Sequence, residues 1–212
     1  MTPRDGRIAD KIFELLGARA PGATICPSDV ARSLEPDDEA AWRALMPEIR
    51  EVADRLRHSG YIRVTAHGET LASAVDAKGP IRLGLQEPRL PRGKHDMAAA
   101  RALVAAGYPA VAPVLRGMLE WVQDQNWPVA FDILLPFLQQ IGLPLAPYLR
   151  EIFEGDDEDW QYVVLQQIVK WNSPLSEALR DVLERIANDP TPAQRRIGLD
   201  EQAREALEPD DA

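Results

Sequence analysis

The second half of the sequence is a succession of short amphipathic segments separated by proline and glycine. Apolar residues recur there at helical spacing, and no segment alternates as a half-buried strand does. Asp96 is placed to cap a helix over 97–106 that Gly107 ends. Further helices are predicted to start at or near Pro109, Trp127-Pro128, Pro144 or Pro147, Asp157 or Asp159, Ser173-Pro174 and Thr191-Pro192. This part of the chain is therefore expected to fold as packed helices.

The first six of these helices pair into hairpins that begin near Asp96, Trp127 and Trp160. A spacing of roughly thirty residues is typical of helical-repeat proteins, in which each hairpin packs on its neighbours. We therefore expect a HEAT-like all-helical domain over 95–207, followed by a frayed acidic tail at 208–212.

The first half has a different order of predicted elements. Apolar periodicity predicts three helices: one ending at Gly17, one starting at Ser28, and one from Trp42 to Gly60 that Pro47 kinks or delays. Strands are predicted at 61–65, 71–75 and 81–83. This order is typical of a winged helix. We therefore expect a mainly α chain with a winged-helix-like α+β domain at 1–85 and a linker at 86–94, which holds Pro88, Pro91 and Gly93.

The charge of the chain is unevenly distributed. Residues 1–84 hold 12 Lys and Arg against 13 Asp and Glu, a net charge of −1, whereas residues 85–212 hold 12 against 21, a net charge of −9. The second half should repel nucleic-acid phosphates, so only the first half is a candidate for nucleic-acid binding.

The cysteine content and the apolar runs bear on location. Cys26 is the only cysteine, which excludes an internal disulfide and fits a reducing compartment. No secretory signal follows Met1, and no apolar run is long enough to span a bilayer. We therefore expect a cytoplasmic protein without a membrane partner. Cys26 itself is expected to be a structural residue at a helix start rather than a nucleophile.

Both halves resemble known bacterial families. Residues 20–31 (APGATICPSDVA), 42–47 (WRALMP) and 79–83 (GPIRL) resemble the domain of unknown function 3253. Four later stretches resemble the domain of unknown function 5071: residues 90–96 (LPRGKHD), 120–130 (EWVQDQNWPVA), 156–160 (DDEDW) and 185–191 (RIANDPT). The resemblances imply a bacterial source, but neither family supplies functional residues that can be transferred to this chain.

A row of arginines on the third helix is the candidate nucleic-acid contact. Arg43, Arg50 and Arg57 are seven residues apart, so they are predicted to lie on one face, opposite the buried one. Basic residues of the strands and the wing would extend the row: Arg63, Lys78 and Arg82. In a winged helix the third helix and the wing meet the duplex. The alternative is a solvated face balanced by Glu48, Glu51 and Asp54, and the near-zero charge of this half favours it or a protein contact.

The tryptophan-rich segment at 121–130 is the candidate protein contact. Trp121 and Trp127 are predicted to bracket a turn in which Asp124 or Asn126 caps the next helix. Trp160 and Tyr162 would lie on the same edge of the array. These six residues form either a tryptophan-wedged corner or a binding ridge, because tryptophan is a favoured interface anchor. The binding ridge requires Trp127 or Trp160 to be partly exposed.

Evidence for catalysis is lacking in the sequence. The acidic run 156–159 has no EF-hand pattern and is better explained as a helix cap than as a metal site. No phosphate-binding loop, zinc spacing or nucleophile elbow occurs, so neither an enzyme, a cofactor nor a metal is predicted. The predicted function is a non-enzymatic interaction or adaptor protein whose acidic helical surface binds a basic protein. The alternative is a transcriptional regulator that binds nucleic acid through the first domain.

Overall fold

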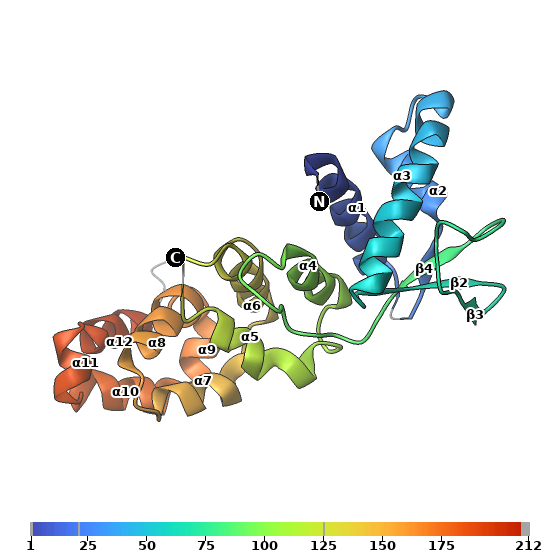
Figure 1. Cartoon of the computed structure of the whole chain (residues 1–212). Coiled ribbons are helices and arrows are strands. Elements are labelled where there is room, and N and C mark those ends of the chain that lie inside the picture. The colour runs from blue at the N-terminus through green and yellow to red at the C-terminus, as the bar shows by residue number, and fades with distance from the viewer. Residues whose placement is uncertain (1, 21, 125, 209–212) are drawn as a thin grey trace. The chain divides into compact units, whose positions relative to one another are not determined.

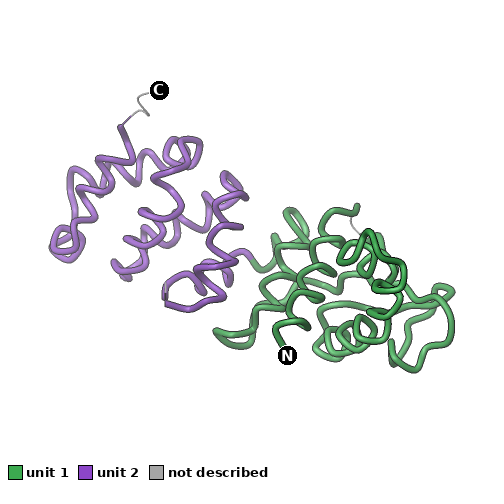
Figure 2. Tube along the Cα trace, turned by 90° about the horizontal axis from the view of Figure 1, so that it is seen from above, with its two compact units in different colours: residues 1–114 green, residues 115–212 purple. Residues whose placement is uncertain are grey.

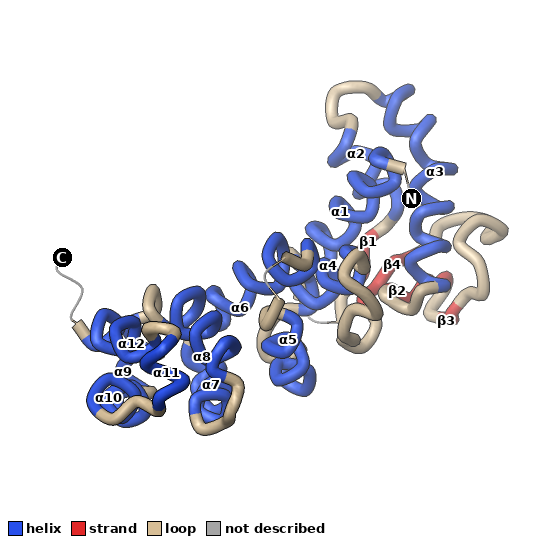
Figure 3. The backbone as a smooth tube through the Cα atoms, turned by 60° about the vertical axis from the view of Figure 1, so that its left-hand side comes forward, coloured by secondary structure: helices blue, strands red, loops and turns tan. Residues whose placement is uncertain are grey.

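The computed structural model describes residues 2–20, 22–124 and 126–208. These residues are mainly helical, with one small sheet near the N-terminus. The chain divides into two compact units, residues 1–114 and 115–212 (Figure 2). The described strands all lie in the first unit (Figure 3). Each unit is described by itself below.

The first unit joins a helical layer to an antiparallel sheet (Figure 1). Its helical segments are α1 (Pro3–Gly17), α2 (Pro27–Leu34), α3 (Glu39–His58), α4 (Met97–Ala106) and the 3-10 turn η1 (Ala112–Val114). Its strands are β1 (Thr24–Ile25), β2 (Ile62–Ala66), β3 (Glu69–Thr70) and β4 (Arg82–Leu85), in the spatial order β1-β4-β2-β3. The three predicted helices of this region are therefore confirmed.

Local capping explains where these helices begin. At the start of α1 the Thr2 hydroxyl accepts from the Asp5 amide at 3.1 Å, and the Asp5 carboxylate accepts from the Thr2 amide at 2.8 Å. This reciprocal pair satisfies two amides that the helix cannot bond. Asp38 caps α3 in a similar way by accepting from the Ala41 amide at 2.9 Å. Since α3 begins at Glu39 and continues through Pro47, the second of the two alternatives for Pro47, a late helix start, is excluded.

The sheet differs from the prediction in two places. The strand expected at 71–75 does not form; β2 instead turns directly into β3 through His67 and Gly68, which have φ of 51° and 88°. Two positive φ angles in a two-residue loop match the right-handed twist of a hairpin. The unpredicted β1 is two residues long and pairs with β4, Ile25 opposite Leu83.

Helix α4 packs on α1 within the first unit. A Cβ added at Gly17 of α1 would lie only 3.1 Å from the Cα of Ala105, so the two helix backbones approach closely. Arg101 of α4 also pairs with Asp10 of α1 at 2.6 Å. The division between compact units therefore falls at 114–115, later than the linker expected from the sequence at 86–94.

The segment expected as a linker is held against the first unit. The Gln86 amide donates to the Tyr61 carbonyl at 3.1 Å, and Arg89 donates to the Gly60 carbonyl. The Tyr61 hydroxyl donates to both oxygens of Asp96, at 2.7 and 2.6 Å. Burial and the Asp96 carboxylate raise the pKa of Tyr61, so the hydroxyl stays a donor at neutral pH. These bonds fix 86–96 rather than leaving it free.

The described part of the second unit is helical throughout. Its segments are α5 (Leu115–Trp121), the π-helical turn η2 (Val129–Leu134), α6 (Leu135–Ile141), the 3-10 turn η3 (Leu143–Leu145), α7 (Ala146–Phe153), α8 (Glu158–Val164), the π-helical turn η4 (Leu165–Val169), α9 (Ser173–Ala178), α10 (Arg180–Asn188), α11 (Pro192–Arg196) and α12 (Leu199–Leu207). Glu208 follows α12, and the rest of the predicted acidic tail lies outside the described residues.

Three predicted helix boundaries are corrected. The helix expected from Pro109 begins with η1 at Ala112. The helix expected at Ser173 is capped by Asn172, which accepts from the Leu175 amide at 3.1 Å, and it divides into α9 and α10. The last predicted helix also divides, into α11 and α12, at Gly198, whose φ is 75°.

A repeated ion pair links three helices of the second unit, α5, α7 and α10. Arg116 at the start of α5 reaches Glu151 of α7 at 3.7 Å, and Arg150 of α7 reaches Asp181 of α10 at 2.7 Å. Each acceptor directly follows the arginine of its own helix, because Glu151 follows Arg150 and Asp181 follows Arg180. The same kind of contact therefore joins α5 to α7 and α7 to α10.

Helix length and apolarity decide whether a segment can span a membrane. Among the described residues, no single helix is both long and apolar enough to cross a membrane. One bent pair, Val129–Ile141 with Leu143–Phe153, passes the same test on length and composition, with a bend of 99°. Leu138 and Leu149 of this pair are buried in the protein core.

Candidate functional site

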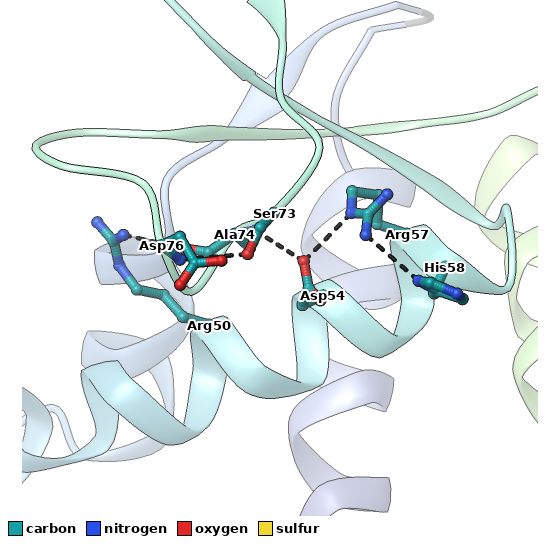
Figure 4. Close-up of polar contacts among 7 residues, drawn as sticks. All are labelled: Arg50, Asp54, Arg57, His58, Ser73, Ala74 and Asp76. Atoms are coloured by element: carbon teal, nitrogen blue, oxygen red, sulfur yellow. Dashed lines mark hydrogen bonds and ion pairs between the residues drawn. The ribbon is translucent and has the colours of Figure 1, made fainter.

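Arg50, in the middle of the predicted arginine row, binds the protein's own backbone (Figure 4). Its guanidinium donates to the carbonyls of Ala74, Ala77 and Gly79 at 3.0, 2.7 and 2.6 Å. These carbonyls belong to the loop between β3 and β4, which includes the segment predicted as a strand. Because Arg50 donates its hydrogen bonds to these carbonyls, it holds the loop against α3 and is not free to donate to a phosphate.

Arg57, further along α3, is also bound by a side chain of the same helix (Figure 4). The Asp54 carboxylate accepts from Arg57 at 3.2 Å and from the Ala74 amide at 2.7 Å. Burial opposes ionisation of Asp54, but the Ala74 amide and Arg57 outweigh it and lower the pKa of this carboxyl. Arg50, Asp54 and Arg57 therefore form one polar cluster, which we call the α3 clamp.

The other basic candidates divide into bound and exposed residues. Arg63 donates to the Leu85 carbonyl at 2.7 Å and the Gly22 carbonyl at 3.1 Å, so it ties β2 to its neighbours. Arg43 pairs with Glu39 at 2.7 Å at the surface. Within the described part of the chain, the Lys78 and Arg82 side chains are exposed and make no hydrogen bond or ion pair. The six residues thus do not form one continuous row of free cations.

The Trp121–Trp127 corner combines packing with partial exposure. The two rings meet edge to face, with centroids 5.1 Å apart, and both side chains are half-buried. Asp124 accepts from the backbone and side-chain amides of Asn126 at 2.9 and 3.2 Å. Asp124 therefore closes the turn and does not cap the helix that follows. The partial exposure of Trp127 meets the requirement of the binding-ridge hypothesis, which stays a prediction.

Trp160 does not share that exposure. It is 8% exposed, and the Arg116 guanidinium lies 4.8 Å from its ring centroid. Tyr162 is half-buried on the same helix. Of the two tryptophans that the binding ridge could expose, Trp160 is therefore the buried one, because Arg116 of α5 covers its ring.

The acidic run at the start of α8 acts as the predicted cap. Asp157 accepts from the Trp160 amide at 2.9 Å, and Glu158 and Asp159 lie in the first turn, where negative charge is favoured. Among the described residues, no group of three or more His, Cys, Asp or Glu side chains is placed to hold a metal ion. Cys26 is half-buried before α2, and its amide donates to Asp29 at 2.8 Å.

Trp171, the most exposed aromatic residue in the described part of the chain, was not among the residues predicted from the sequence. Trp171 is 75% exposed, more than any other large apolar residue among those described. It lies between η4 and α9, next to the capping Asn172. Leu143 is 52% exposed, and a Cβ at the preceding Gly142 would lie 3.2 Å from the side-chain amide nitrogen of Asn172, so the two turns lie close together. The signal in the sequence that could have identified Trp171 is its position in a polar turn, directly before the capping residue Asn172.

Two family models match the chain. Residues 5–86 match the model described as protein of unknown function (DUF3253), and residues 89–207 match the model described as domain of unknown function (DUF5071). The chain belongs to the DUF5071 family. Both resemblances seen in the sequence are thereby confirmed, in the expected order. Among curated proteins, none matches the chain.

The two matches divide the candidate residues by class. The α3 clamp and the other basic candidates lie in the DUF3253 match, whereas every tryptophan candidate, including Trp171, lies in the DUF5071 match. The DUF5071 match also includes α4, which packs on α1 in the first compact unit. The family match and the compact unit therefore begin at different residues.

Proposed function

We propose that this DUF5071 protein is a non-enzymatic interaction or adaptor protein whose second unit binds a basic protein partner. Residues 115–212 hold 8 Lys and Arg against 19 Asp and Glu, a net charge of −11, whereas residues 1–114 hold 16 against 15, a net charge of +1. A surface of one charge sign attracts the opposite sign and speeds association. The charge difference supports a basic partner for the second unit.

The proposal includes an architecture for each unit. We infer a HEAT-like array of helical hairpins in the second unit, and the repeated pairs Arg116–Glu151 and Arg150–Asp181 support it. We infer a winged-helix-like domain for the part before α4, supported by the order of elements and the His67-Gly68 hairpin. Helical arrays bind partners along the edges where their turns are exposed.

The exposure of Trp171 is the observation that carries the proposal. Water contact over three-quarters of an indole is unfavourable, and tryptophan is enriched among the residues that contribute most to protein interfaces. Leu143, in a turn whose Gly142 lies close to Asn172, adds exposed apolar surface to the second unit. An exposed indole within a strongly acidic unit fits a partner that carries both apolar and cationic side chains.

Site-directed photocrosslinking tests this function. The full chain would carry a photoreactive phenylalanine at position 171, with Phe131, an exposed residue of η2, as the matched control position. We expect position 171 to capture a basic protein that, once purified, binds the unmodified chain directly and less tightly as salt rises. The proposal is overturned if no captured protein binds directly with this salt dependence.

We also propose that the protein is bacterial and lies in the cytoplasm. The lone Cys26 supports the cytoplasmic location.

A nucleic-acid-binding regulator is the second candidate, favoured by the exposure of Lys78 and Arg82 near the sheet. It is the weaker one, because Arg50, Arg57 and Arg63 bind groups of their own unit. Duplex DNA titrated with the full chain at low salt tests it. Binding that Lys78→Ala and Arg82→Ala reduce, with a lower salt slope, would support the regulator, and absence of binding would exclude it.

A further inference from the structure

Trp171 already has a cation beside its ring. The Lys170 ammonium lies 5.4 Å from the ring centroid and is also bound to the Glu205 carboxylate of α12. The Lys170 side chain is only 25% exposed, whereas Glu205 is 48% exposed. One lysine is therefore held between an exposed indole and a carboxylate.

A cavity of about 520 Å³ lies beside this group in the second unit. Three carboxylates line it, from Glu177, Glu205 and Glu208, and Lys170 is one of its two cations. The other, Arg180, is held by Glu177 at 2.6 Å and by Glu184 at 3.7 Å. The cavity lining thus has more carboxylates than cations, and one of its cations, Lys170, also contacts the Trp171 ring.

We propose that Trp171 and Glu205 form an anchor for an arginine side chain of the basic partner, and that Lys170 occupies this anchor in the free protein. The inference rests on the proposed function and names the group that it recognises. A cation over an indole is favourable, and a planar guanidinium stacks on the ring better than an ammonium does. It also bonds a carboxylate through two donors, whereas Lys170 provides a point charge.

Binding at the anchor follows from an exchange of cations. The partner's guanidinium stacks on the exposed indole and takes the Glu205 carboxylate, and Lys170 moves into solvent, where its ammonium is well hydrated. Glu208, which has no ion pair among the described residues, adds negative charge at the rim. Lys170 therefore competes with the partner, so removing its charge should strengthen binding.

Two capped peptides test the anchor, one with five Arg-Gly repeats and one with five Lys-Gly repeats. Their affinity for the full chain would be measured by fluorescence anisotropy at low and physiological salt. We expect the arginine peptide to bind more tightly than the lysine peptide, and Trp171→Ala to weaken it roughly three- to tenfold. Phe131→Ala, at another exposed apolar residue of the second unit, should change little.

A second pair of variants tests the competition. Lys170→Met keeps the side-chain stem and removes the charge, so we expect roughly threefold tighter binding of the arginine peptide. Arg195→Met makes the same charge change at an exposed position of α11 and should have a smaller effect. Trp171→Phe, which keeps a ring, should retain part of the affinity, and circular dichroism checks that each variant folds.

The outcomes separate this inference from the proposed function. If both peptides bind in a salt-sensitive way but Trp171→Ala and Phe131→Ala behave alike, the proposed anchor is wrong. The proposal that the acidic surface binds a basic partner then still stands. Equal affinity for the two peptides, or equal effects of Lys170→Met and Arg195→Met, also overturns the anchor. If neither peptide binds the unmodified chain at low salt, the basic-partner function fails together with it.

Discussion

Replacing Arg50 with alanine tests whether the arginine row of α3 serves the fold or a ligand. Arg50 makes three charge-assisted hydrogen bonds, to the carbonyls of Ala74, Ala77 and Gly79. A hydrogen bond to a charged group contributes about 1.5 to 3 kcal/mol, but water replaces the partner where the carbonyl is exposed. Ala74 is fully buried, so its carbonyl loses a partner that water cannot restore. We therefore expect Arg50→Ala to lower the free energy of unfolding of the first unit by about 2 to 4 kcal/mol.

Arg43→Ala is the matched control, because Arg43 lies seven residues earlier on the same helix. Its bond to Glu39 joins side chains that are 66% and 70% exposed, so its loss should cost about 0.5 kcal/mol. Urea denaturation of the full chain compares the two variants, and hydrogen exchange over 71–80 reports whether the loop is released. Equal losses of stability, or an unchanged exchange rate in Arg50→Ala, would refute the assignment of Arg50 as a loop clamp.

Three further changes test separate parts of the structure. Gln161 is fully buried and bonds the carbonyls of Ile152 and Gly155 and the side chain of Gln194, so Gln161→Ala should lower the urea-unfolding free energy of the second unit by about 3 kcal/mol. The lowered pKa of Asp54 gives stability that is present above about pH 4 and lost as pH falls through the folded-state value. Asp54→Asn should therefore reduce the fall in urea midpoint between about pH 5 and 3, and an unchanged fall would contradict this. Gly60→Ala should lower the Tm and cost at least about 1 kcal/mol, since Gly60 has a φ of 76° and an added Cβ would displace the guanidinium bound to its carbonyl.

Helix positions were predictable because they depend on local signals. The apolar spacing that ends at Gly17 and the caps at Asp96 and Asp157 are readable without any partner. The strand predicted at 71–75 failed for a non-local reason: Asp54 binds the Ala74 amide and Arg50 binds the Ala74 carbonyl, so both backbone groups have side-chain partners. The two-residue β1 is likewise defined only by its pairing with β4.

Candidate-site residues were harder to predict than helices. Spacing placed Arg43, Arg50 and Arg57 on one helix, but it carries no information on the carbonyls that Arg50 meets 24 to 29 residues later. The tryptophans differ for the same reason. Trp127 lies just before η2 and Trp160 lies in the first turn of α8, yet only Trp160 is covered by Arg116, a residue of an earlier helix. Exposure therefore depends on contacts between helices, which a single sequence does not specify.

The charge of the second unit is larger than its internal ion pairs can neutralise. It holds 8 cations against 19 carboxylates, so 11 carboxylates remain even if every cation pairs once. The repeated pairs already engage Arg116 and Arg150, and Lys170 engages Glu205. Uncompensated like charges repel one another and disfavour the compact state. The proposed cationic partner would relieve this repulsion, and the exposed indole of Trp171 would provide the apolar contact that charge alone does not give.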